Sequence, residues 1–267
     1  MSEIFKTLQT LPIPARQKSW ADVDFGSSEK KLNGNQVIID ELKEVVDCQK
    51  IIIEANSDIQ YVIVQNDQPE ADSFRTRQFY LQQNAKLELI TIILGGATSE
   101  LIQEVYLEGA GAVSLQKIVV AGTGEQKMHL IANNIHSAPN CQSDITVKTI
   151  LSGLAISAFN GLIKIKHGAQ QTNAYLRHDT YVVSETAKNI TIPGLEIDAN
   201  DVKASHSASQ SKIRPEDLLY LTSRGLTSEE GRYLILEGFV STVVERIREE
   251  GVREQTADLL QTKINQC

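Results

Sequence analysis

Short apolar runs that are rich in β-branched residues recur along the chain from about residue 35 to about residue 205. Glycine, asparagine, aspartate or serine residues interrupt the runs, and in places the alternation is clear, as where Ile145 and Val147 lie between polar neighbours. Such runs predict β-strands. Because no helical pattern of about 10–15 residues separates them, a doubly wound α/β sheet is disfavoured. The clearest runs are 37–39, 51–53, 61–64, 87–94 and 113–120.

Tight hairpin signals are scarce between these strands, with Asn33-Gly34 and Asn160-Gly161 as the candidates. Parallel rungs of roughly 20–25 residues would fit the region about seven or eight times. An aromatic content of only 5% also suits a narrow lumen. We therefore predict a mainly β fold built as a parallel β-helix (solenoid). Since the sequence has no clean repeat, periodicity alone leaves a large β-sandwich as the alternative.

The pattern becomes helical from about residue 213. Pro215 suits the first position of a helix, and Gly225 suits its C-terminal cap. Thr227 and Glu230 form a capping box for a second helix, which we expect to end near Gly251. A weaker third helix is predicted from about residue 254 to 264. Apolar residues of the second helix recur at helical spacing and predict internal packing rather than partner contact. They are Leu236, Val240, Val243 and Ile247.

These patterns divide the chain into three segments. Residues 1–34 form a short leader that we expect to be extended, with at most one short helical piece. Residues 35–212 form the β-helix core. Residues 213–267 form a C-terminal α-helical domain.

Composition and missing motifs exclude several functional classes. The chain has 34 acidic and 26 basic residues, with a net charge of −8, which argues against a nucleic-acid partner. No secretory signal is visible, and no apolar stretch approaches the about 20 residues that span a membrane. The phosphate loop, the GxSxG elbow and the HExxH motif are absent from the sequence. We therefore expect a cytoplasmic protein that is not an enzyme and has no membrane partner.

Single histidines and cysteines are scattered over the chain, and each is interpreted as structural when taken alone. The three cysteines form neither a disulfide framework nor a CxxC clamp. Imidazole can bind iron or zinc, so a composite site formed by stacked rungs stays open. The residues are His129, His136, His167, His178 and His206, with Cys48, Cys141 and Cys267.

An enzyme that acts on an extended polysaccharide is an alternative for a β-helix. Such enzymes need clustered carboxylates along a groove. The acidic residues of the β region are scattered instead, and secretion would also be expected. They include Glu88, Glu100, Glu104, Glu108 and Asp144.

The segment around residues 193–226 carries the most specific motif. Residues 193–206 read PGLEIDANDVKASH, and residues 215–226 read PEDLLYLTSRGL. In order and spacing, they resemble the SufB/SufD family of iron–sulfur cluster assembly proteins, whose pattern is P-x-L-E-I-x-A-x-D-V-x-C-S-H followed by F-Y-L-x-S-R-G. Residues 159–172 are similar to the F-x-G…A-Q-x-T stretch of the family, and the leader element 11–20 looks like a P-x-R-x-x-x-W element of SufD. The resemblance is strong over residues 155–240 and fainter over the rest of the chain.

The resemblance implies a right-handed β-helix followed by a helical domain. It also implies a non-catalytic scaffold subunit of a SUF-type complex, in which the β-helix pairs with a SufB-like chain or with a second copy. A SufC-type ABC ATPase would bind the C-terminal helices. No stably bound cofactor is implied, and a transient iron–sulfur cluster is the one candidate. The implied docking residues are Leu218, Leu219, Tyr220, Leu221, Arg224 and Gly225.

Within the motif, His206 is the candidate cluster ligand, and His178 is a weaker candidate. The alternative to a ligand role for His206 is a structural role, in which the side chain caps the last rung. For Arg224 and Gly225, we favour a helix-capping role. Leu218 to Leu221 cover both faces of a short helix, so some of them should meet a partner.

The chain also departs from the family pattern. Ala204 stands where the family usually has a cysteine, and Ser207 stands where SufB-type sequences have a glutamate. Because alanine cannot bind iron, a two-ligand site is reduced to His206. The chain is also shorter than the family, so the sequence predicts a trimmed, SufD-like paralogue. A structural solenoid that keeps ATPase docking but has lost cluster binding is the alternative.

Overall fold

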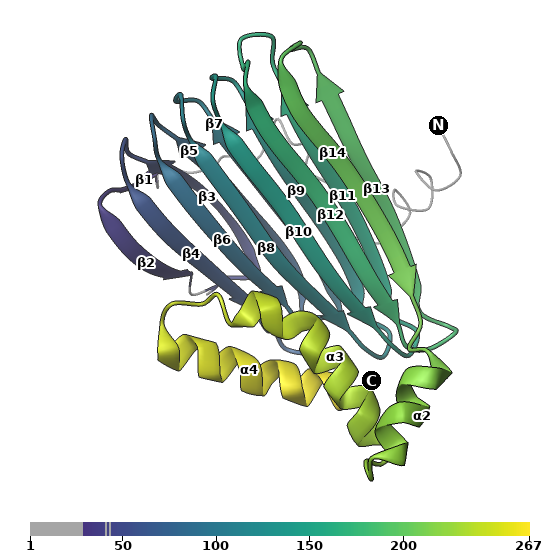
Figure 1. Ribbon diagram of the computed structural model, residues 1–267. Helices are drawn as coiled ribbons and strands as arrows, with labels where there is room; N and C mark the ends of the chain where they lie inside the picture. Colours follow the sequence, from purple (N-terminus) through teal and green to yellow (C-terminus); the bar gives the residue numbers. More distant parts are fainter. Residues whose placement is uncertain (1–28, 41, 43) are drawn as a thin grey trace.

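The computed structural model describes residues 29–40, 42 and 44–267, so the expectation for the leader lies mostly outside the described residues. Within this part, the chain forms two parallel sheets of seven strands each (Figure 1). Sheet A consists of β1 (Glu29–Leu32), β3 (Val46–Ile53), β5 (Asp72–Leu81), β7 (Thr98–Leu107), β9 (Lys127–His136), β11 (Ile156–Ile165) and β13 (Lys188–Ile197). Sheet B consists of β2 (Asn35–Asp40), β4 (Asp58–Gln65), β6 (Lys86–Ile93), β8 (Val113–Gly122), β10 (Gln142–Leu151), β12 (Thr172–Val182) and β14 (Val202–Ser211).

Strand order confirms the parallel β-helix and excludes a sandwich of antiparallel strands. Odd-numbered strands pair only with odd-numbered strands, and even with even, because the chain changes sheet at every turn. Gln60 lies beside Glu88, which is 28 residues further along the chain. Lys164 lies beside Glu196, which is 32 residues further along. The predicted rung of 20–25 residues was therefore too short, because each rung holds two strands of up to eleven residues and two turns.

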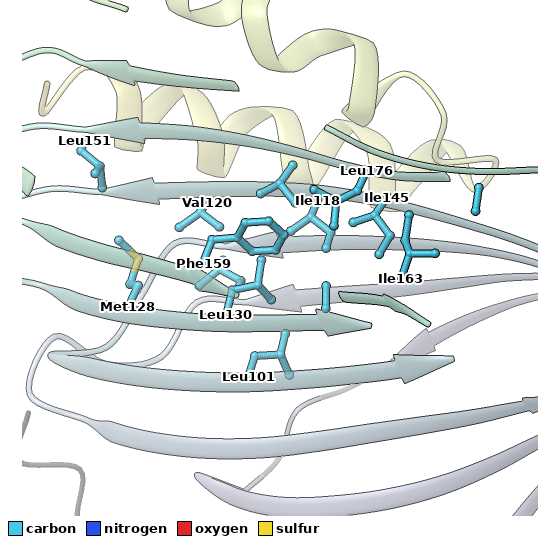
Figure 2. Packing of buried hydrophobic residues seen from close by; sticks show 14 of the residues in the cluster. Leu101, Ile118, Val120, Met128, Leu130, Ile145, Leu151, Phe159, Ile163 and Leu176 are labelled. Carbon is cyan, nitrogen blue, oxygen red and sulfur yellow. The ribbon is translucent and has the colours of Figure 1, made fainter. Parts of the chain in front are cut away.

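Two apolar clusters fill the lumen between the sheets. Phe159 contacts aliphatic side chains from both sheets, including Leu130 and Ile118 (Figure 2). Most lumen positions are aliphatic, which agrees with the low aromatic content. The lumen also holds a row of buried polar side chains that composition did not predict, for example Gln103, which donates a hydrogen bond to Gln116.

The described part of the chain ends with three helices: α2 (Pro215–Ser223), α3 (Ser228–Val244) and α4 (Glu250–Ile264). α3 and α4 lie on the outer face of sheet B (Figure 1). The stripe predicted for the second helix is fully buried there, which confirms internal packing. Within the described residues, no helix is long and apolar enough to cross a membrane.

The connection between α3 and α4 corrects two predicted helix boundaries. α3 ends at Val244 rather than near Gly251, and α4 begins at Glu250 rather than near residue 254. The helix ends where the backbone of the following residues forms hydrogen bonds with a side chain of sheet B. The side chain of Gln60 donates to the carbonyl oxygen of Arg246 and accepts from the backbone N–H of Arg248, both at 2.8 Å.

Candidate functional site

The solenoid ends on an uncovered rung formed by β13 and β14. In the described part of the chain, each is the outermost strand of its sheet, so each has one edge without a neighbouring strand. Nearly every residue of β14 is exposed. On this rung and the one below it, Ile197 and Tyr175 are large exposed side chains with apolar bodies. The end of the solenoid therefore presents free backbone groups together with apolar surface.

The two edge strands differ in their capacity to pair further. β13 contains Pro193, which has no N–H to donate, and proline is one of the residues that blunts an edge strand. β14 has ten residues, no proline and one charged residue, Lys203. A long edge strand without such protection is a ready template for a strand from another chain. Pairing at this end is therefore expected along β14.

His206 lies on the lumen side of β14, at the mouth of the solenoid. Its register partner on β12 is Leu176, which belongs to the lumen core, and Ala204 pairs in the same way with Ala174. His206 itself is exposed. A second chain that paired along β14 would therefore meet His206 at the contact.

His178, the weaker candidate, is enclosed in the lumen. Its ring nitrogens contact threonine hydroxyls: Nε2 is 2.9 Å from Oγ1 of Thr149, and Nδ1 is 2.9 Å from Oγ1 of Thr191. The ring also packs edge-on against Phe159. Both nitrogens thus have hydrogen-bond partners, which favours a structural role. His178 lies on β12, one rung inward from the mouth, and its register partner on the edge strand β14 is Ala208.

Burial of His178 and His136 makes the stability of the folded chain sensitive to acid. Both rings are fully buried, and burial lowers the pKa of each from 6.5 to about 4. Each ring stays neutral in the folded protein at mildly acidic pH, whereas the unfolded chain takes up these protons below about pH 6.5. The unfolded state therefore binds more protons between pH 6.5 and 4, and stability falls as the pH falls through that window.

We expect each of these two rings to lower the free energy of unfolding by about 2 kcal/mol at pH 5 relative to pH 7. In the His178→Gln variant, the loss between pH 7 and pH 5 should shrink by about that amount. Urea unfolding at the two pH values measures it, with His167→Gln as the control because that histidine is exposed. An unchanged loss in His178→Gln would contradict the assignment.

The remaining candidate ligands do not join His206. His136 contacts the hydroxyl of Ser143 inside the lumen, and His167 is exposed on a turn. Cys141 is buried, with its thiol donating to the carbonyl oxygen of Gly109. Among the described residues, no group of three or more His, Cys, Asp or Glu side chains could hold a metal ion. The described residues therefore provide no set of ligands that joins His206.

α2 is an exposed helix with no buried residue. Leu219 and Tyr220 are 70% and 60% exposed. Leu218 and Leu221 are half-buried and lie beside Gly231 of α3. The prediction that this short helix has apolar residues on both faces is thus confirmed. One face packs inward, and the other is available to a partner.

The residues after α2 have the geometry of a helix cap. Gly225 has a φ of +98°, in the left-handed region that favours glycine, and its N–H bonds the carbonyl oxygen of Thr222. Arg224 lies over the ring of Tyr220 at 5.3 Å from its centroid. This geometry favours the capping role for Gly225, and it places Arg224 beside the exposed face of α2.

A cleft of about 1100 Å³ lies between the turns at one side of the solenoid and the C-terminal end of α4. None of the expected site residues lines it. The candidate site is instead an exposed strand and an exposed helix, surfaces that suit contact with other proteins. Sequence reasoning missed Tyr175 and Ile197, because their exposure depends on which rung is last.

Comparison with known proteins shows which family this chain is similar to. Residues 27–239 match the family model for the SufBD core domain of the SUF system for FeS cluster assembly. The chain is 35% identical over 170 residues to the iron–sulfur cluster assembly protein SufD of Bacillus subtilis. These aligned residues cover 64% of this chain and 38% of that protein. It is 27% identical over 205 residues to SufD of Escherichia coli, covering 77% of this chain and 48% of that protein.

A third relative is a SufBD family protein of Mycobacterium tuberculosis, 27% identical over 199 residues, which cover 74% of this chain and 23% of that protein. The match thus spans between about a quarter and a half of the length of these relatives. The β-helix and α2 both lie within the residues that the family model covers.

Proposed function

We propose, on the premise that this chain belongs to the SufB/SufD family of the SUF iron–sulfur cluster assembly system, that it is a non-catalytic scaffold subunit of such an assembly complex. The observation that carries the proposal is the uncovered edge of β14 with His206 at the mouth of the solenoid. A scaffold needs surfaces for other subunits, and the candidate site consists of such surfaces.

The β-helix pairs through β14 with a SufB-like chain or with a second copy of this chain. Main-chain hydrogen bonds along the free edge would supply the affinity, and neighbouring side chains such as Tyr175 and Ile197 the specificity. The contact would put His206 beside the partner's residues. A cluster under assembly is held transiently there, as cargo rather than as a resident cofactor.

A SufC-type ATPase binds the exposed face of α2, formed by Leu219 and Tyr220 with Arg224 beside them. Tyrosine and arginine are among the residue types that contribute most of the binding energy in protein interfaces. Because the sequence has no phosphate loop, the ATPase activity of the complex comes from that partner.

Co-expression tests the assembly. The chain should elute on size exclusion together with a SufC-type subunit and a SufB-like subunit, at a mass above that of the single chain. If the chain elutes alone in the presence of both, the scaffold proposal is wrong.

We expect His206→Ala to lower the iron–sulfur content of the reconstituted complex about tenfold or more, the scale seen when even the partners of metal ligands are changed. Stability should be unaffected because His206 is exposed. Anaerobic reconstitution followed by absorbance spectroscopy measures the content. The matched control is His167→Ala, an exposed histidine on a turn.

The second candidate function is a structural solenoid that keeps ATPase docking but has lost cluster binding. Ala204 favours it, because a methyl group stands on the lumen side of β14 where the family pattern has a thiol. In that case, His206→Ala and His167→Ala would both leave the iron–sulfur content of the complex unchanged.

A further inference from the structure

The cleft beside α4 is lined by the stacked turns that follow β4, β6 and β8. These turns approach one another closely, since a Cβ atom at Gly95 would lie 2.3 Å from the backbone nitrogen of Asp67. The last turn of α4, with Lys263, forms a further wall. No residue of β14 or α2 lines this cleft, so it is separate from the surfaces proposed for assembly. The lining residues of the turns are 66–70, 94–97 and 123–126.

The side chain of Gln126 holds the walls of the cleft together. Its Nε2 donates to the carbonyl oxygens of Gly96 at 2.8 Å and Leu94 at 3.3 Å. Its Oε1 accepts from the backbone N–H of Thr123 at 3.0 Å and from Nζ of Lys263 at 2.5 Å. Because one side chain joins two turns and α4, the amine of Lys263 is held at a defined place in the cleft.

Lys263 is a half-buried cation without a counter-ion. An ammonium group has three donors, and Gln126 is the one acceptor for them in the part of the chain that the structure describes. Burial lowers the pKa of this amine, the direction expected where no carboxylate offsets the loss of water. Charges that are removed from water are normally paired. An anion in the cleft would supply the missing partner.

Further donors line the same cleft. The backbone N–H groups of Gly124 and Glu125 have no acceptor among the described residues. Successive N–H groups in a turn are a common arrangement for binding anions. Lys127 also lines the cleft, is half-buried and forms no ion pair within the described ranges. The cleft therefore offers two amines and two backbone donors.

The acidic residues of the cleft do not cancel these donors. Asp67 is neutralised by the buried Arg75, which donates two hydrogen bonds to its carboxylate at 2.7 and 2.8 Å. Glu70 and Glu125 are exposed, so water screens their charges. Among the unpaired charged groups of the cleft, the amines are half-buried and the carboxylates are exposed. The inner wall is therefore the positive part of the cleft.

We propose that this cleft binds the oxyanion group, a phosphate or a carboxylate, of a small molecule, with Lys263 as its main anchor. Lys127 and the N–H groups of Gly124 and Glu125 are the further donors. A volume of about 1100 Å³ is larger than an inorganic ion needs and suits a small organic molecule. Binding would also tie α4 more firmly to the turns, because Lys263 belongs to α4.

Nuclear magnetic resonance of the nitrogen-15-labelled full chain tests the site. The probes are inorganic phosphate and glutarate, a dicarboxylate, each compared with sodium chloride at equal ionic strength. At least one probe should shift the amide signals of Gly124 and Glu125 in a saturable way, whereas chloride should not. The probe that binds more tightly identifies the oxyanion. If neither probe gives saturable shifts, or chloride gives the same shifts, the proposal is wrong.

Three variants locate the binding. Lys263→Gln keeps a donor but removes the charge, and it should weaken binding of the tighter probe about tenfold. The matched control is Lys164→Gln, because Lys164 is an exposed lysine that pairs with Glu196 and does not line the cleft. It should leave the affinity unchanged. Glu125→Gln should bind at least as tightly as the wild type, since it removes a like charge. Weaker binding by Glu125→Gln, or unchanged binding by Lys263→Gln, would overturn the proposal.

Amine labelling of the unmodified protein keeps the test decisive if Lys263→Gln does not fold. A saturating concentration of the tighter probe should slow acetylation of Lys263 by acetic anhydride several-fold, as measured by mass spectrometry. Acetylation of Lys164 should proceed at the same rate with and without the probe. Equal rates at Lys263 with and without the probe would show that no anion binds there.

Discussion

Replacing Arg77 by methionine should lower the free energy of unfolding by about 3–5 kcal/mol. Arg77 is fully buried in the first rungs of the lumen. Its Nε donates to Oδ2 of Asp40 at 2.5 Å, and its Nη2 donates to Oδ2 of Asp47 at 2.6 Å. Methionine keeps most of the volume but leaves the carboxylate of Asp40 buried without its cation, which is the costly half of breaking a buried ion pair.

Arg177→Met is the matched control for this prediction. Arg177 also lies on a strand and pairs with an aspartate, Asp179, but its side chain is 66% exposed. Exposed pairs contribute about 0–1 kcal/mol, so the control should unfold nearly as the wild type does. Urea denaturation followed by circular dichroism measures both variants. Equal losses of stability for Arg77→Met and Arg177→Met would contradict the role of burial.

The double change Leu219→Asp and Tyr220→Asp should weaken binding of the SufC-type ATPase by about 100-fold or more, which corresponds to about 2.7 kcal/mol. Both side chains lie on the exposed face of α2, and two aspartates there would have to be desolvated on binding. The folded chain should tolerate the change, because no residue of α2 is buried. Titration calorimetry of the ATPase subunit with the chain measures the affinity.

Leu154→Asp is the control for binding, since Leu154 is a large apolar side chain that is exposed on a turn between β10 and β11. It should leave the affinity for the ATPase unchanged. The docking assignment fails if the α2 double variant binds as tightly as the control while both show the thermal stability of the wild type.

Local patterns predicted much of the fold because they depend on neighbouring residues. The capping box at Thr227 and Glu230 is formed, and α2 begins at Pro215 as expected. The end of the second helix could not be predicted, because it depends on a bond to Gln60, far away in sequence. Near-continuous apolar runs such as 87–94 did carry a signal for the helices over sheet B, since a strand buried on both faces loses its alternation.

The rungs share a repeat of backbone conformation, although the sequence has no clean repeat of residue types. One corner of each successive rung holds a residue with positive φ, and each such residue donates its N–H to a carbonyl of the next rung. Asparagine, glycine and glutamine share the role, so no single letter recurs. The corner residues are Asn56, Asn84, Gly111, Asn140 and Gln171.

The candidate site was only partly predictable for a similar reason. The motif pointed to His206 and to α2, which the structure places on exposed elements. Whether β14 has a free edge depends on its being the last strand of sheet B, which no local pattern encodes. The lumen position of His178 likewise follows from its register with Val147 of the lumen core on the neighbouring strand β10.

Hydrogen–deuterium exchange in the presence of a SufC-type and a SufB-like subunit tests the central claim most directly. The account predicts that amides of β14 and of α2 exchange much more slowly in the complex than in the chain alone, because a strand pairs along β14 and a protein covers α2. Exchange in both segments at the rate of the chain alone would contradict the claim that the open end and α2 are the assembly surfaces.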